Sequence, residues 1–243
     1  MKRAAAWRCV ALPLAAAFLA GCSTAPVPVP GPTVVDQSVA PAWATQYAAL
    51  VAGGGTLLRL DPRHSEVRIR VFRGGRAPGL GHNHVLAAPK FIGYFFLPAA
   101  GAGAARFDLE LRLDELELDD PALRAALGPA FAAELTAGDI ANTRAHMLGE
   151  DNLQAARYPF VRIHGVAVTG EGSALAARVA VELHGQRHEL WLPLAIEGLP
   201  RHLSASGSFV LRQSDFGVQP YSALGGLIAV QDEVLISFTL VGE

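Results

Sequence analysis

Apolar and polar residues alternate along several segments of this chain, and this period of two constrains the fold more than any other feature. In residues 65–71, Val67, Ile69 and Val71 alternate with three charged residues. The same pattern recurs in residues 175–183, 190–196 and 234–240. A strand with one polar and one apolar face is typical of an antiparallel sheet that covers a core on one side. The sequence therefore predicts an all-β, antiparallel fold.

The segment 106–120 (RFDLELRLDELELDD) shows where this sheet bends. Apolar residues occupy odd positions from 107 to 113 but even positions at 116 and 118, so the facing reverses at Asp114 and Glu115. An extra residue of this kind is what a β-bulge supplies in a curved sheet. Strong curvature favours closure, and we expect a barrel of about eight strands, whose interior is either filled by side chains or holds one slim ligand.

One helical insertion interrupts the strands between Asp120 and Arg157. Asp120 followed by Pro121 indicates an N-cap with proline in the first turn. A second cap at Asp139 is expected to begin the helix DIANTRAHML, which ends at Gly149.

The first 21 residues predict an exported protein. A basic start is followed by an apolar run of about 12 residues, which is too short to span a membrane and is typical of a signal peptide. The sequence LAGC at residues 19–22 resembles the bacterial lipobox, which implies that Cys22 is acylated and begins the mature chain. Cys9 lies in the removed part, so no disulfide is expected.

Three regions follow from this organisation: a lipoprotein signal peptide at 1–21, a lipidated Cys22 with a Pro/Gly-rich tether at 22–55, and a barrel domain at 56–243. Alternating prolines in residues 23–41 favour an extended conformation, and this segment is expected to hold the domain up to about 60 Å from a membrane. Within the second region, residues 43–51 predict a short helix on the domain. The net charge of -2 gives no reason to expect a nucleic-acid partner.

The segment GLGHNHVL at residues 79–86 is the main candidate for chemistry. In a strand, His82 and His84 point to the same side. Zinc needs three or four ligands, the other histidines are scattered, and no cysteine remains in the mature chain. We interpret the segment as a strand at the rim of the interior, whose histidines bond to the backbone, to each other or to a ligand headgroup. No GxSxG nucleophile or phosphate-binding loop is present, so no catalytic residue, metal ligand or cofactor is predicted.

Several segments, taken in order, resemble the YceI-like proteins: DPRHSEVRIRV, GLGHNHV, LQAARYPFVRIHG, VELHGQRHELWLPL, RQSDFGV and QDEVLISF. The resemblance covers residues 56–243. It implies a lipocalin-like antiparallel barrel that encloses a long-chain isoprenoid or another amphiphile. It also implies that inward apolar side chains form the binding surface. A polar group at its mouth, His82 or His84, is expected to orient the headgroup of the ligand. The expected apolar ligand-binding residues are Val67, Ile69, Val71, Phe107, Leu109, Leu111, Val179, Val181, Leu190, Leu192, Phe209, Leu211, Ile236 and Phe238.

We therefore expect a non-catalytic carrier or storage lipoprotein. It is anchored to a membrane of the cell envelope through Cys22 and faces the periplasm, and Ser23 after the cysteine favours the outer over the inner membrane. Two alternatives stay open. One is a structural or partner-binding lipoprotein with a filled barrel, and the other is a metal-dependent enzyme that uses His82 and His84. The sequence also leaves a homodimer open.

Overall fold

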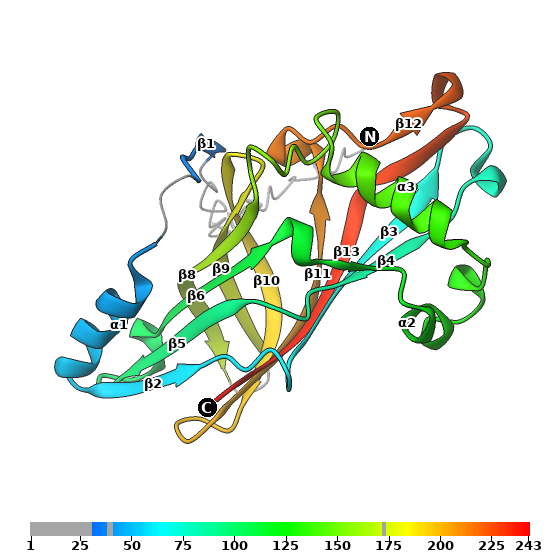
Figure 1. Ribbon diagram of the computed structural model, residues 1–243. Coiled ribbons are helices and arrows are strands. Elements are labelled where there is room, and N and C mark those ends of the chain that lie inside the picture. Colours follow the sequence, from blue (N-terminus) through cyan, green and yellow to red (C-terminus); the bar gives the residue numbers. More distant parts are fainter. Residues whose placement is uncertain (1–30, 38–40, 172–173) are drawn as a thin grey trace, which may run out of the picture.

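The computed structural model describes residues 31–37, 41–171 and 174–243. The expected signal peptide and Cys22 lie outside these ranges. The described chain forms one antiparallel sheet of thirteen strands (Figure 1). Its main path, in spatial order, is β2 (Gly55–Arg59), β5 (Ile92–Pro98), β6 (Arg106–Arg112), β8 (Phe160–Glu171), β9 (Ala174–Leu183), β10 (Gln186–Glu197), β11 (Leu203–Arg212), β13 (Ile228–Gly242), β3 (Glu66–Gly74), β4 (His84–Ala87) and β7 (Glu117–Leu118). Two short strands are added, since β1 (Thr33–Val34) pairs with β10 and β12 (Ser222–Ala223) pairs with β13.

The sheet curls so that each end of the strand order meets a segment from near the other end. Strand β7 follows β6 in the chain after a short 3₁₀ turn, η3 (Leu113–Glu115), yet it pairs with β4 at the other end of the strand order. At the opposite end of the barrel, Arg59 and Glu243 exchange backbone hydrogen bonds of 2.7 and 3.0 Å. The predicted all-β barrel fold is confirmed. Short strands raise the number of strands above the expected eight.

A β-bulge was predicted where the facing of the side chains reverses, at Asp114 and Glu115. This prediction is wrong, because the structure has the η3 turn at this place. The turn is needed because the chain leaves its neighbour β8 and crosses to β4. Leu113, the first residue of the turn, and Leu116, just after it, are both buried. Register shifts do occur elsewhere, between Gly165 and Ala167 in β8 and between Val230 and Val234 in β13.

The helical insertion lies beside the end of the barrel where β3 ends and β4 begins (Figure 1). Asp120 caps α2 (Pro121–Ala126) as predicted, accepting hydrogen bonds from the backbone N–H groups of Ala122 and Leu123. The second helix, α3 (Ala137–Leu148), has its N-cap at Thr136 and not at Asp139. Asp139 is the third helical residue and completes a capping box with Thr136, which is why it resembles a cap in the sequence. Further 3₁₀ turns are η1 (Pro78–Leu80), η2 (Ala102–Ala104), η4 (Pro129–Phe131), η5 (Ser214–Phe216) and η6 (Leu224–Gly226).

The described part of the segment before the barrel packs against the barrel, whereas an extended tether was predicted for much of it. Thr33 and Val34 pair with the first residues of β10, and Gln37 is buried. Helix α1 (Trp43–Ala52) forms where a short helix was expected, and it buries Trp43 and Tyr47 against the outside of the sheet. No helix in the described part of the chain is long and apolar enough to cross a membrane.

Candidate ligand-binding cavity

The interior of the barrel contains a cavity of about 470 Å³. This volume falls in the range of about 300–1,000 Å³ that is typical of small-molecule sites. Its walls are mainly the apolar faces of the curled sheet, and small residues such as Ala177 and Ala205 line it together with larger ones. Side chains therefore do not fill the barrel, which argues against the alternative of a protein with a filled interior.

The structure places all but one of the predicted ligand-binding residues around this cavity. Leu190 is the exception: it pairs with Val179 across β9 and β10 and packs into the surrounding hydrophobic core without lining the cavity. The predicted residues that do line it are Val67, Ile69, Val71, His82, His84, Phe107, Leu109, Leu111, Val179, Val181, Leu192, Phe209, Leu211, Ile236 and Phe238. They come together because alternate residues of antiparallel strands share one face.

One end of the cavity has a polar rim, of which the sequence predicted the histidines of residues 79–86 but not the residues of helix α3. Helix α3 contributes Asp139, Asn142 and His146, and the segments around it contribute His82 and Tyr221. The rings of His146 and Tyr221 lie 5.2 Å apart, so the helix and the chain before β12 meet across the mouth. The spacing of Asp139, Asn142 and His146 places them on one face of a helix, and this is the signal that was available in the sequence.

Arg144, on the side of helix α3 opposite the rim residues, holds the helix in place over the mouth. The guanidinium of Arg144 donates a 2.6 Å hydrogen bond to the backbone oxygen of Leu116 and another to that of Asp114. These carbonyls belong to the η3 turn and the chain just after it. The turn that bends the sheet therefore also fixes the helix that carries the rim.

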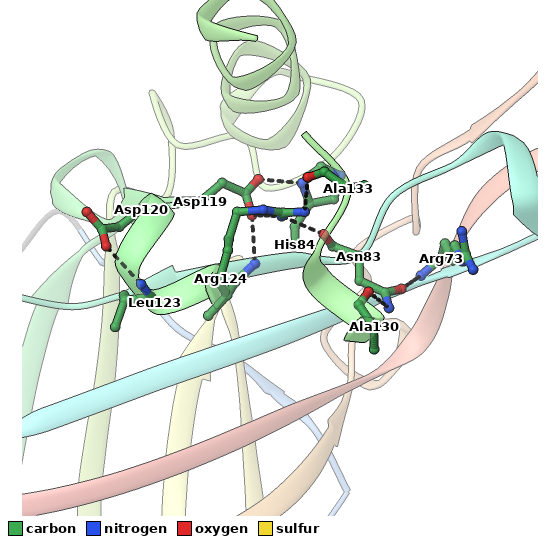
Figure 2. Close-up of polar contacts among 10 residues, drawn as sticks. Arg73, Asn83, His84, Asp119, Asp120, Leu123, Arg124, Ala130 and Ala133 are labelled. Carbon is green, nitrogen blue, oxygen red and sulfur yellow. Dashed lines mark hydrogen bonds and ion pairs between the residues drawn. The ribbon is translucent and has the colours of Figure 1, made fainter. Parts of the chain in front are cut away.

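A buried network anchors β4, which begins at His84, whereas His82 precedes the strand and was wrongly predicted to lie in it (Figure 2). Nδ1 of His84 lies 2.6 Å from Oδ2 of Asp119, whose side chain is fully buried. The other carboxylate oxygen of Asp119 accepts hydrogen bonds from the backbone N–H of Val85 (3.0 Å) and from the guanidinium of Arg124 (2.6 Å). Arg124 donates further to the backbone oxygens of Asn83 and Ala133. The network links β4, the end of β7 and helix α2.

Opposing effects set the pKa of Asp119. Burial raises it, but hydrogen bonds from His84, from the backbone of Val85 and from Arg124 outweigh burial, and the pKa is lowered below its usual value. The carboxylate is therefore ionised at neutral pH and pairs with a buried guanidinium. The backbone of Asp119 has φ of 56°, a left-handed conformation that aspartate tolerates better than most residues.

Asn83, between the two histidines, also has a structural role. Its side-chain oxygen accepts a hydrogen bond from the backbone N–H of Arg73, and its amide donates to the backbone oxygen of Ala130, both at 2.9 Å. The side chain thus joins β3 to the η4 turn. The three residues of HNH have different partners, and the sequence interpretation of histidines bonded to the backbone or to each other is wrong for His84.

The histidine pair does not form a metal centre with its neighbours. The ring centroids of His82 and His84 lie 6.5 Å apart at nearly a right angle, and Nδ1 of His84 faces Asp119. Within residues 31–37, 41–171 and 174–243, no group of three or more His, Cys, Asp and Glu side chains has the arrangement of a metal site. His82 is exposed at the rim, close enough to Asp139 to lower the pKa of that carboxyl slightly, although hydrogen bonds from Thr136 lower it more.

A second polar cluster lies on the outside of the sheet, under helix α1, and is separate from the cavity. Asp108 accepts a hydrogen bond from the hydroxyl of Tyr47 (2.7 Å) and lies 2.5 Å from Nδ1 of His164. Nε2 of His164 lies 3.3 Å from Glu182. Burial lowers the pKa of His164, but the two carboxylates outweigh burial and raise it to about 9. The edge of Trp43 covers the same imidazole, so the cluster fastens α1 to the barrel.

A curled antiparallel sheet around one apolar cavity with a polar mouth defines the class of barrel-shaped binding proteins. Within this class, the chain belongs to the family whose model, YceI-like domain, matches residues 58–242. No curated protein matches the sequence.

Two solved structures are similar to this chain. The chain is similar to BcnA of Burkholderia cenocepacia, with 17% identity and a TM-score of 0.54 over 75% of this chain and 98% of BcnA. It is also similar to the YCEI protein of Campylobacter jejuni, with 12% identity and a TM-score of 0.46 over 63% of this chain and 81% of that protein. At these identities, the likeness to BcnA shows a common fold.

Proposed function

We propose that the protein binds one lipid-like amphiphile in its barrel, as a non-catalytic carrier or store. The observation that carries this proposal is the 470 Å³ cavity, whose walls along the strands are mostly apolar and most of whose polar side chains gather at one end. Transfer of a hydrocarbon tail from water into such a cavity is favourable by about 0.8 kcal/mol per methylene. Binding by this means needs no reactive side chain.

The mouth of the cavity gives the ligand an orientation. His82, Asp139, Asn142 and His146 offer hydrogen-bond donors and acceptors at the rim, while the strand residues that line the cavity are apolar apart from His84 and Arg106. We therefore place the polar headgroup beside α3 and the tail among the strands. His84 takes a smaller part than expected from the sequence, because Asp119 already binds it.

The proposed location is the cell envelope, with the barrel facing the periplasm and held to a membrane, the outer rather than the inner one, by acylated Cys22. Support comes from the LAGC sequence at residues 19–22 and from Ser23 after it. Two or more acyl chains give lasting membrane residence, whereas a single chain gives only a marginal one. Replacement of Cys22 by alanine is expected to release the protein into the soluble periplasmic fraction.

Native mass spectrometry of protein purified from a bacterial envelope tests the binding function. We expect an adduct whose mass corresponds to one amphiphile per chain and which organic solvent extracts. Protein that is repeatedly recovered without an adduct, and that takes up no added fatty acid or isoprenoid, would contradict the proposal.

A further inference from the structure

Two loops meet at the open end of the barrel beside α3. One contains η1 and follows β3, and the other contains η6 and lies between β12 and β13 (Figure 1). Backbone hydrogen bonds join them, from Arg76 N–H to Gly226 oxygen (3.0 Å) and from Ala77 N–H to Leu227 oxygen (2.9 Å). The guanidinium of Arg76 also donates to the backbone oxygen of Gly225 at 2.8 Å. The two loops therefore form one fixed surface.

This surface presents large apolar side chains to solvent. Leu80 is 63% exposed and Leu224 is 68% exposed, and Tyr221 and Leu227 beside them are more than one third exposed. We call these four residues the apolar rim. Leu80 and Tyr221 also line the cavity, so the apolar rim is continuous with the proposed binding surface. Exposed apolar groups that adjoin a binding site are typical of interaction surfaces.

The backbone at Leu224 adds an independent observation. Leu224 has φ of 51°, in the left-handed region, and is followed by two glycines that also have positive φ. Leucine is disfavoured in this conformation, whereas glycine or asparagine adopts it readily. Backbone preference therefore does not explain a leucine here, and strained residues of this kind cluster at functional sites.

The course of the chain toward Cys22 indicates what the apolar rim faces. Strand β1 lies at the same end of the barrel as β12 and α3 (Figure 1). Only eleven peptide units separate Cys22 from Thr33. They span at most about 40 Å, well below the 60 Å expected for a tether that runs to Pro41. A membrane that holds Cys22 therefore lies within about 40 Å of β1, which is at the open end of the cavity.

We propose that the apolar rim docks the mouth of the cavity onto a lipid bilayer, so that an amphiphile passes between bilayer and barrel without crossing water. This inference rests on the proposed function. Leucine side chains at loop tips insert into the boundary between headgroups and acyl chains, and their buried apolar area supplies the binding. Because apolar contact drives the docking, it is expected to persist in high salt.

Vesicle flotation tests the docking. The full-length chain with Cys22→Ala, which carries no acyl group, is mixed with vesicles of phosphatidylethanolamine and phosphatidylglycerol. In this background, the rim pair Leu224→Ser with Leu227→Ser, neither of which lines the cavity, is compared with a control pair, Ile92→Ser with Val210→Ser. The control residues are 57% and 58% exposed but lie on β5 and β11, away from the two joined loops. All variants keep the same leader, so differences between them report the substituted surface.

We expect the rim pair to weaken vesicle binding at least tenfold and the control pair less than twofold. Equal vesicle binding by the parent and the rim pair, equal losses in both pairs, or no binding by the parent would overturn the inference. Uptake of a fluorescent fatty acid in vesicle-free buffer is measured in parallel and is expected to stay within twofold in the rim pair. If no variant takes up the fatty acid, the proposed function fails, whereas the vesicle result still decides the docking.

Discussion

Nδ1 of His84 lies 2.6 Å from Oδ2 of Asp119, and this contact separates the two histidines of the HNH segment into different roles (Figure 2). His84 belongs to a buried network that holds β4, whereas His82 is exposed at the mouth of the cavity. The two histidines thus have different roles: His84 stabilises the fold, and His82 belongs to the proposed ligand site.

Alanine substitutions are expected to separate these roles. His84→Ala removes one partner of a fully buried carboxylate, and the cost of such a loss is about 1–3 kcal/mol in the free energy of unfolding. His82→Ala leaves that free energy within about 0.5 kcal/mol, because it changes only an exposed side chain. Urea denaturation of both variants measures the difference. Equal destabilisation would show that His84 has no special structural role.

Asp119→Asn is expected to destabilise the fold more strongly. The variant keeps the shape and tolerates the left-handed backbone, but it leaves the guanidinium of Arg124 buried without an anion. Breaking a buried ion pair in this way costs about 3–5 kcal/mol. Asp114→Asn is the matched control, since it breaks an exposed pair with Arg112 that is worth about 1 kcal/mol or less. Urea denaturation that gives similar losses for the two variants would contradict the role assigned to Asp119.

The cluster under α1 predicts a loss of stability in alkaline solution. The pKa of His164 is raised from 6.5 to about 9 in the folded protein, so its contribution is complete below pH 6.5 and is lost as the pH rises toward 9. The change is on the order of 3 kcal/mol, at 1.36 kcal/mol per pKa unit. Unfolding free energies measured from pH 6 to 9.5 are compared between the parent and His164→Gln. The two curves are expected to converge as the pH rises, and a constant gap would exclude this titration.

Reducing the volume of the cavity is expected to weaken ligand binding. Ala177→Phe places a ring in the interior, whereas Ala176→Phe places the same ring on the other face of β9, as the alternation of a strand requires. We expect the first variant to lower the affinity for a fluorescent fatty acid at least tenfold, and the second to leave it within twofold. Overpacking costs about 1–3 kcal/mol of stability, so a thermal melt checks that both variants are folded. Full binding by Ala177→Phe would place the ligand elsewhere.

The alternation of apolar residues was sufficient to predict the fold class and most of the cavity wall. Val67, Ile69 and Val71 line the cavity, as expected, because the side-chain period of a strand is a local property of the backbone. Leu190 has the same pattern but lies in the surrounding core, since alternation selects a face of the sheet and not a depth within the barrel.

The partners of the polar residues were decided by tertiary structure alone. Asp119 and His84 are 35 residues apart, and they meet only because the η3 turn carries the chain from β6 across to β4. The sequence determined which side chains each strand and helix presents on a face, through the fixed periods of the backbone. The closure of the sheet determined which of those faces meet, because long-range contacts depend on how the whole chain packs. It thereby formed the cavity, its polar mouth and the network that holds the mouth in place.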